Sequence, residues 1–372
     1  MKILLVGAGG YAARYVNALL TLSDPEIAVA GIVEPYFSTC ATRAEIEAAG
    51  IPVYGTMDAF YELHTADLAI ISTPSFLHRE QSICALRHGS YVLCEKPVAP
   101  TVAEAEEMQE AEKAYGKWIA IGYQWSFSTA IQRLKADILS GALGNPISFK
   151  TAISWPRTLD YYGRGTKWAG RLFRDGIPIL DSIASNACAH YLHNMLFLLG
   201  DRPDRSAEVS QLSGECFRAN DIESFDTCIL KMTTTAGVPL YFAASHATET
   251  KREPEFQYVF ENARVVYAKD DEPHIKAMFD DGRRICYGDP FENNFKKLLD
   301  CIDAIRKGET PVCTVETALP HTRLIQKIYD KLPITPFPRE LIRHHEAENR
   351  IFVQGLFEKM YNAYATESMM GD

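Results

Sequence analysis

A glycine-rich hexapeptide near the start of the chain has the spacing of a dinucleotide-binding loop. The sequence GAGGYA at 7–12 follows an apolar run at 2–6 and opens a helical segment. In this GxGxxA pattern Gly7 permits a tight turn, Gly9 lets a pyrophosphate approach the backbone, and Ala12 allows close packing of helix on sheet. The positive end of the helix would bind the phosphates, so redox chemistry with a dinucleotide is expected. The expected cofactor contacts in this loop are Gly7, Gly9, Gly10, Tyr11 and Ala12.

An acidic residue at the end of the next predicted strand bears on the choice of dinucleotide. Glu34 is placed where a carboxylate can bind the adenosine ribose hydroxyls. The first lysine or arginine after it is Arg43, so a 2′-phosphate would meet repulsion without compensation. We therefore expect NAD, with NADP the weaker alternative. A solvated loop acid is the other interpretation of Glu34.

The elements that must position this loop alternate between apolar runs and helical segments. Such alternation predicts a parallel sheet with right-handed crossovers and helices on both faces. We expect a Rossmann dinucleotide-binding domain over 1–123. The expected strands are 2–6, 27–33, 68–72, 91–94 and 118–122, and the expected helices are 11–22, 40–49, 76–88 and 101–115.

The pattern changes after this first domain. Residues 225–287 contain several strands joined by turns, which is typical of an antiparallel sheet. We expect an α+β domain over 124–372 with a largely antiparallel, open-faced sheet. A sheet face not covered by the chain's own helices predicts a homodimer or homotetramer. Helices are expected near 128–140, 184–199, 290–307 and 315–331, with a polar tail helix near 338–364.

Composition excludes several classes of protein. A net charge of -10 argues against nucleic acid as a partner. No apolar stretch approaches the roughly 20 residues that span a bilayer, so no membrane association is expected. The 9 cysteines are scattered without a CxxC pair, which favours reduced thiols and a cytoplasmic location. No carboxylate completes a ligand set around His190 and His193, so no metal is expected.

Two further motifs make the chain resemble the Gfo/Idh/MocA oxidoreductase family. The segment STPSFLH at 72–78 is similar to that family's TPxxxH segment near the nicotinamide, and EKP at 95–97 resembles its most specific motif. The Gly-Tyr pair at 122–123, the helix ending at 141–144 and the helix at 186–200 recur in the expected order. The resemblance therefore covers nearly the whole chain.

The resemblance implies hydride transfer between nicotinamide and a carbinol or carbonyl carbon of a sugar, cyclitol or related polyol. The family's lysine, here Lys96, hydrogen-bonds the reacting oxygen, and its DxxxH pair falls on Asn186 and His190. Asparagine cannot exchange a proton, so acid/base work falls on His190 with Lys96, while Asn186 orients the substrate or the ring. This division is chemically reasonable, because histidine titrates near neutral pH and a lysine stabilises developing alkoxide charge. Further expected cofactor contacts are Thr73, Pro74, His78, Glu95 and Lys96, with Glu95 supporting the lysine.

A stretch rich in aromatic and arginine side chains follows in the second domain. Aromatic faces stack on sugar C–H surfaces, and guanidinium groups bind carboxylate or hydroxyl oxygens. A subunit interface would have a similar composition, and both interpretations stay open. For His193, substrate contact and packing are equally open. The candidate substrate-binding residues are Tyr123, Trp155, Arg157, Tyr162, Arg164, Trp168, His193 and His246.

Three functions are compatible with these residues. The leading hypothesis is an NAD-dependent dehydrogenase or reductase acting on a CH–OH group of a small carbohydrate or polyol. An NAD-using glycosidase, in which the hydride returns and the cofactor stays bound, would use the same residues. A non-catalytic regulator that senses a sugar or dinucleotide is favoured by Asn186, whereas Lys96 and His190 count against it.

Overall fold

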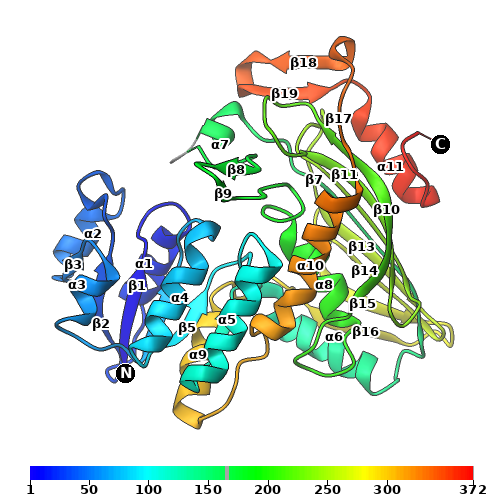
Figure 1. Ribbon diagram of the computed structural model, residues 1–372. Coiled ribbons are helices and arrows are strands. Elements are labelled where there is room, and N and C mark those ends of the chain that lie inside the picture. Colours follow the sequence, from blue (N-terminus) through cyan, green and yellow to red (C-terminus); the bar gives the residue numbers. More distant parts are fainter. Residues whose placement is uncertain (164–166, 372) are drawn as a thin grey trace. The chain divides into compact units, whose positions relative to one another are not determined.

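A computed structural model describes residues 1–163 and 167–371 of the chain (Figure 1). The chain divides into two compact units. Unit 1 comprises 1–124 together with Phe295–Leu319, and unit 2 comprises 125–294 together with the residues from Pro320 onward. The first boundary lies next to the expected one at 123. The expected second domain is interrupted, because Phe295–Leu319 belongs to unit 1.

Unit 1 contains a six-stranded parallel sheet in the order β3-β2-β1-β4-β5-β6. This order is that of a doubly wound dinucleotide-binding fold, so the expected fold of the first domain is confirmed. The short strand β3 was not expected, since two residues carry too little periodicity to be recognised. The strands are β1 (Lys2–Val6), β2 (Ala28–Val33), β3 (Val53–Tyr54), β4 (Leu68–Ile71), β5 (Tyr91–Cys94) and β6 (Ile119–Ile121).

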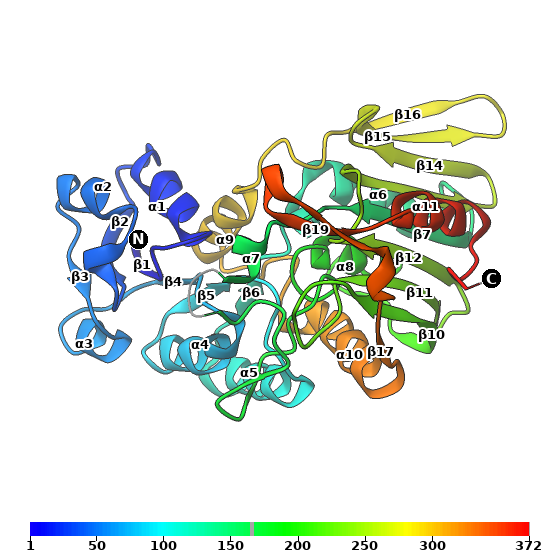
Figure 2. The ribbon, with the colours of Figure 1, turned by 90° about the horizontal axis from the view of Figure 1, so that it is seen from above.

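Helices cover both faces of this sheet. Figure 2 shows α1, α2 and α9 on one side and α3, α4 and α5 on the other. Helix α5 begins with a capping box, in which the Thr101 side chain accepts from the Glu104 backbone and Glu104 accepts from the Thr101 backbone. The helices are α1 (Ala12–Leu20), α2 (Arg43–Ala48), α3 (Met57–Tyr61), α4 (His78–Arg87), α5 (Val102–Tyr115) and α9 (Lys296–Lys307).

Unit 2 contains a nine-stranded sheet in the order β16-β15-β14-β13-β7-β12-β11-β10-β17. Its neighbours are antiparallel except β12 with β7 and β10 with β17, which confirms a largely antiparallel sheet. Its strands are β7 (Pro146–Ser154), β10 (Val209–Arg218), β11 (Thr227–Thr234), β12 (Pro239–Ser245), β13 (Arg252–Phe260), β14 (Ala263–Ala268), β15 (Glu272–Phe279), β16 (Arg284–Gly288) and β17 (Ile334–Pro336).

Helices lie on both faces of the second sheet (Figure 1). One face is covered by α6, α8 and α10. The other carries α11, whose Leu356, Met360 and Ala363 are buried in a cluster with Ala243 and Tyr241 of the sheet. The expectation of a face left uncovered by the chain's own helices is therefore wrong at the centre of the sheet. The helices are α6 (Thr129–Leu139), α7 (Leu159–Gly163), α8 (Ala189–Leu198), α10 (Val315–Lys331) and α11 (Leu356–Thr366).

The C-terminal region differs from the expected tail helix over 338–364. An antiparallel hairpin of β18 (Ile342–His345) and β19 (Arg350–Val353) occupies most of that range, and α11 begins only after Gly355. The hairpin is fixed by contacts distant in sequence. Arg350 donates to the carbonyl oxygens of Thr248 at 2.9 Å and Glu249 at 2.8 Å. These long-range bonds outweigh the local helical pattern.

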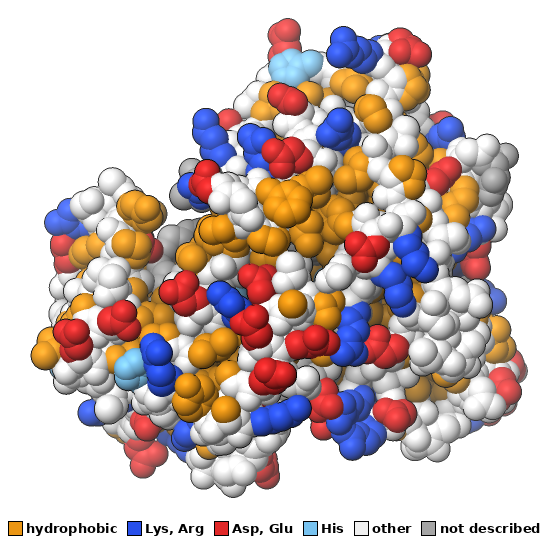
Figure 3. Space-filling model, viewed as in Figure 1, with side chains coloured by type: hydrophobic (Ala, Val, Ile, Leu, Met, Phe, Trp, Pro, Cys, Tyr) orange, Lys and Arg blue, Asp and Glu red, His pale blue; other side chains and the backbone are white. Residues whose placement is uncertain are grey.

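The visible surface in Figure 3 carries basic and acidic side chains interspersed, without one large basic area. Within the part of the chain that the structure describes, no helix is both long enough and apolar enough to cross a bilayer.

Candidate cofactor and substrate sites

The backbone after β1 has the geometry expected of a cofactor loop. Gly7 has φ +93°, and a Cβ atom there would lie 2.6 Å from the Ser72 carbonyl oxygen, so only glycine fits. A Cβ added at Gly9 would meet no described atom within 4 Å. The backbone at Gly9 is thus open to approach by a phosphate, while Ala12 is fully buried against the sheet.

Glu34 joins this loop to the end of β2. Its carboxylate accepts hydrogen bonds from the backbone N–H of Ala8 at 2.9 Å and of Tyr36 at 3.0 Å. A half-buried acid held in this way is not a freely solvated loop residue. The nearest basic residue along the chain, Arg43, forms an ion pair with Glu47 at 2.7 Å. The arrangement suits ribose hydroxyls better than a 2′-phosphate.

His78 connects two loops at the carboxyl edge of the sheet. Its ring is 1% exposed, with Nδ1 2.8 Å from the Pro97 carbonyl oxygen and Nε2 2.9 Å from the Thr73 carbonyl oxygen. Burial lowers the pKa of His78. The histidine expected near the nicotinamide therefore ties the segment containing Thr73 and Pro74 to the turn that contains Lys96. Its two ring nitrogens are directed at backbone carbonyls.

Lys96 is half-buried and follows β5 directly, at the edge of a parallel sheet where open α/β folds bind ligands. The peptide bond from Lys96 to Pro97 is cis. Tyr123, which was expected to contact substrate, lies 0% exposed after β6. Tyr123 stays a predicted substrate contact.

Glu95 has a partner that the sequence did not indicate. Its carboxylate is ion-paired with Lys297 of α9, and it accepts a hydrogen bond from the Tyr15 hydroxyl at 2.7 Å. Lys297 also approaches the Tyr11 hydroxyl at 3.4 Å. Glu95 contacts Lys96 through the lysine backbone N–H, at 3.3 Å. The support expected from Glu95 for Lys96 thus acts on the backbone, and no local motif could have identified Lys297.

In unit 2, His190 lies in the first turn of α8, and Asn186 lies in the turn before it. The Asn186 amide donates to the Tyr161 hydroxyl at 3.4 Å. His193, one turn later, is 1% exposed and lies 3.1 Å from the Ser126 hydroxyl through Nε2. These contacts favour the packing interpretation of His193.

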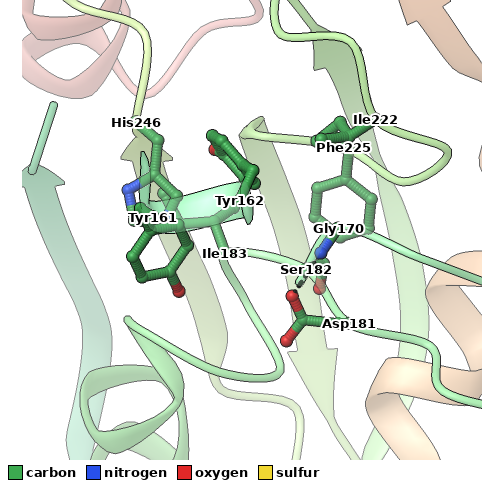
Figure 4. Close-up of a pocket in the computed structure, with 9 residues that line it drawn as sticks. All are labelled: Tyr161, Tyr162, Gly170, Asp181, Ser182, Ile183, Ile222, Phe225 and His246. Atoms are coloured by element: carbon green, nitrogen blue, oxygen red, sulfur yellow. Dashed lines mark hydrogen bonds between the residues drawn. The ribbon is translucent and has the colours of Figure 1, made fainter. Parts of the chain in front are cut away.

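A small hollow lies beside this segment within unit 2. Tyr161 and His246 face each other at its rim with ring centroids 5.8 Å apart, and Asp181 accepts from the Gly170 N–H at 2.6 Å (Figure 4). His246 Nδ1 lies 2.7 Å from the Trp155 carbonyl oxygen. The lining residues are Tyr161, Tyr162, Gly170, Asp181, Ser182, Ile183, Ile222, Phe225 and His246.

The pocket brings together several of the predicted substrate contacts. Tyr162 and His246 line it, and burial raises the pKa of Tyr162 well above its usual value. Trp155 and Arg157 lie in the segment between β7 and α7 that leads into it. Arg164 lies outside the described residues, and Trp168 is half-buried. Asp181 and Ser182 were not predicted, because no motif marks them in the sequence.

Comparison with known proteins identifies the first domain. The model of the family GFO_IDH_MocA, described as an oxidoreductase family with an NAD-binding Rossmann fold, matches residues 1–123. Residues 1–123 are therefore similar to the NAD-binding Rossmann domain of that family. The matched residues include the glycine loop, Glu34 and Lys96. The match confirms the resemblance seen in the sequence and the expectation of an NAD-binding domain.

Curated relatives are similar to part of the chain. Inositol 2-dehydrogenase of Renibacterium salmoninarum is 31% identical over 39% of this chain and 43% of its own length. The 1,5-anhydro-D-fructose reductase of Ensifer adhaerens is 28% identical over 56% of this chain and 60% of its own length. The chain thus matches about half the length of these relatives.

A solved structure shows the same fold over a larger part of the chain. The WlbA dehydrogenase of Bordetella pertussis, crystallised with NADH and UDP-GlcNAcA, superposes with a TM-score of 0.71 at 20% identity, covering 89% of this chain and 95% of its own. At this level of identity the similarity supports the fold.

Proposed function

We propose that the chain is an NAD-dependent oxidoreductase that transfers a hydride between nicotinamide and a carbinol or carbonyl carbon of a sugar, cyclitol or sugar-derived polyol. The observation that carries the proposal is the position of Lys96. It follows β5 at the carboxyl edge of the matched NAD-binding domain, in a turn that His78 contacts through Nδ1, which lies 2.8 Å from the Pro97 carbonyl oxygen. A lysine in this position can hydrogen-bond the reacting oxygen and stabilise its negative charge.

The residues of the first unit fit the cofactor. Gly9 offers open backbone, Gly7 makes the turn, and Glu34 supplies the acid for the ribose hydroxyls. Bound NAD supplies the acceptor for the hydride that leaves the substrate carbon. We expect NAD in preference to NADP, because no described basic side chain lies free beside Glu34 for a 2′-phosphate. The other predicted cofactor contacts stay predictions: Gly10, Tyr11, Ala12, Thr73 and Pro74.

The protein's own groups handle the substrate hydroxyl. His190 takes the hydroxyl proton during oxidation and returns it during reduction, since imidazole exchanges protons near neutral pH. Lys96 donates a hydrogen bond to the same oxygen as its charge develops. Asn186 orients the substrate through its amide, as its contact with Tyr161 suggests.

The substrate class rests on the names of the relatives and on the aromatic pocket. Relatives are named for an inositol and an anhydro sugar, and aromatic faces of the kind provided by Tyr161 and Tyr162 pack against sugar C–H surfaces. A homodimer or homotetramer in the cytoplasm also stays a proposal. Light scattering would measure the oligomeric state.

The test is NADH formation by purified protein with NAD and a panel of sugars, cyclitols and sugar acids. Lys96→Met and His190→Gln should each lower turnover by about 10²–10⁴-fold. Matched controls are Lys113→Met on α5 and His274→Gln on β15, both at exposed positions, and these should keep full activity.

Two results would reject the proposal. Turnover that survives both active-site substitutions would remove the assigned pair. Tight NAD binding with no oxidation of any panel member would reject the dehydrogenase, and assays of glycoside cleavage on the same samples would then separate the NAD-using glycosidase from a non-catalytic regulator.

A further inference from the structure

Arg157 occupies an unusual position in unit 2. Its guanidinium carbon lies 5.4 Å from the centre of the Trp155 ring and 5.1 Å from that of the Tyr161 ring. Its backbone N–H donates to the His246 carbonyl oxygen at 3.1 Å. Because Tyr161 and His246 line the pocket, the guanidinium is held at the pocket's border between two aromatic faces.

The charge of this arginine has no counter-ion among the described residues. Other arginines have one, for example Arg171 with Glu223 at 2.7 Å and Arg79 with Glu107 at 2.7 Å. Arg157 is half-buried, and its Nε is buried without a hydrogen-bond partner among the described residues. A buried donor on a charged group costs stability unless an acceptor reaches it, so this unpaired Nε–H beside a pocket indicates a ligand.

Two neighbouring side chains share this property. Trp155 Nε1 and the Tyr162 hydroxyl are likewise buried without a hydrogen-bond partner among the described residues. Indole and guanidinium N–H groups can only donate, so a ligand that satisfies them must bring acceptor oxygens. The three buried polar groups therefore favour a ligand that carries acceptor oxygens, and the charge of the guanidinium favours a negative charge on that ligand.

The acidic residues nearby do not supply that group. Asp226 accepts from the backbone N–H of Ala219 at 3.0 Å and of Asn220 at 2.9 Å. Asp181 accepts from the Gly170 N–H. Both carboxylates are bound to backbone groups of their own loops, and neither forms an ion pair with Arg157.

We propose that Arg157 binds an oxyanion, a carboxylate or a phosphate, carried by the sugar-type substrate. The inference rests on the proposed function, which supplies the sugar-type part of the ligand. It adds that this ligand carries a negative charge. Guanidinium groups bind carboxylate and phosphate through paired N–H donors, and stacking between aromatic rings fixes the plane of the group in advance.

The experiment compares matched neutral and anionic ligands on NAD-loaded protein by calorimetry. D-glucuronate and D-galacturonate test a carboxylate, D-glucose 6-phosphate tests a phosphate, and D-glucose and D-galactose are their neutral counterparts. At least one anion should bind about tenfold or more tightly than its neutral counterpart. Arg157→Leu should remove that preference, whereas Arg157→Lys should retain part of it. The control Arg171→Leu, an exposed arginine with a partner, should keep it.

The outcomes separate this proposal from the proposed function. Arg157-dependent binding of an anion that is never oxidised would keep the subsite and reject the dehydrogenase. Oxidation of neutral sugars with no preference for anions would keep the dehydrogenase and reject the subsite. The anion subsite is overturned if no anion binds, or if the preference for the anion is unchanged in Arg157→Leu. It is also overturned if Arg157→Leu dissociates an oligomer without changing ligand affinity. Unchanged NAD affinity of the variant shows that it is folded.

Discussion

Lys297 and Glu95 form a buried ion pair inside unit 1, although 202 residues separate them in the sequence. The side chain of Lys297 is 0% exposed and that of Glu95 is 9% exposed. Burial opposes the charge on Lys297, but Glu95 and the Tyr11 hydroxyl together outweigh that effect, and the pKa of the lysine is raised. The pair attaches α9 to the loop that carries Lys96, so a late segment of the chain helps to hold an early functional loop.

Removing one partner of this pair should destabilise unit 1. Lys297→Met leaves the Glu95 carboxylate buried without a counter-ion, and we expect a loss of about 3–5 kcal/mol in the free energy of unfolding, measured with urea. The adjacent Lys296 pairs with Asp300 where both are about one-third exposed, so Lys296→Met should cost about 1 kcal/mol or less. Equal losses in the two variants would contradict the argument.

A double variant tests the cause of that loss. Glu95→Gln combined with Lys297→Met removes both charges, so it should be more stable than Lys297→Met alone. A double variant that is less stable would show that packing, and not the uncompensated carboxylate, dominates at this position.

Glu34 should control the affinity and choice of dinucleotide. Glu34→Ala removes the acceptor for Ala8 and Tyr36 and the acid for the ribose, so NADH should bind about tenfold or more weakly. The ratio of NADPH to NADH affinity should rise, because a 2′-phosphate no longer meets a carboxylate. Fluorescence titration measures both. Asp58→Ala, on α3, serves as control, and an unchanged ratio in Glu34→Ala would argue against the ribose assignment.

The buried His193 should make stability depend on pH. Burial lowers its pKa well below the usual value, and the charges of His321 and Lys135 act in the same direction. The unfolded chain binds a proton there near pH 6.5, whereas the folded chain does not. Stability is therefore complete above that pH and falls as the pH drops below it, by about 1.4 kcal/mol per pH unit for this group.

Urea unfolding at several pH values between 5 and 8 measures this slope. His193→Gln should reduce the slope by about 1.4 kcal/mol per pH unit, which corresponds to one proton. Ser126→Ala removes the hydrogen-bond partner of His193 but no titrating group, so it should preserve the slope. A slope that is the same in His193→Gln and in the wild type would refute the assignment.

The cover provided by α11 should contribute substantially to the stability of unit 2. Met360 is fully buried in the cluster on the outer face of the sheet, so Met360→Ala should cost about 2–5 kcal/mol. The neighbouring Lys359 is exposed, and Lys359→Ala should have little effect. Thermal unfolding followed by circular dichroism compares the two. Similar melting temperatures would mean that the helix adds little to the sheet.

Much of unit 1 was predictable because its signals are local. The turn at Gly7 requires glycine, and the alternation of apolar runs with helical segments specifies a parallel sheet through rules that hold within short windows. The strands at 2–6 and 91–94 were expected at their observed bounds. The tail was mispredicted, because long-range bonds from Arg350 and Val353 selected a hairpin over a helix.

The sequence by itself therefore determined the fold class, the cofactor loop and the candidate residues Lys96 and His190. Only the tertiary structure decided which residues contact one another around these sites. It paired Glu95 with Lys297, placed Asp181 beside Gly170 and Tyr161 near His246, and left Arg157 between two aromatic rings. The physical reason is that ion pairs, pockets and covered faces join residues far apart in the chain, and no periodicity or spacing in a single sequence records such contacts.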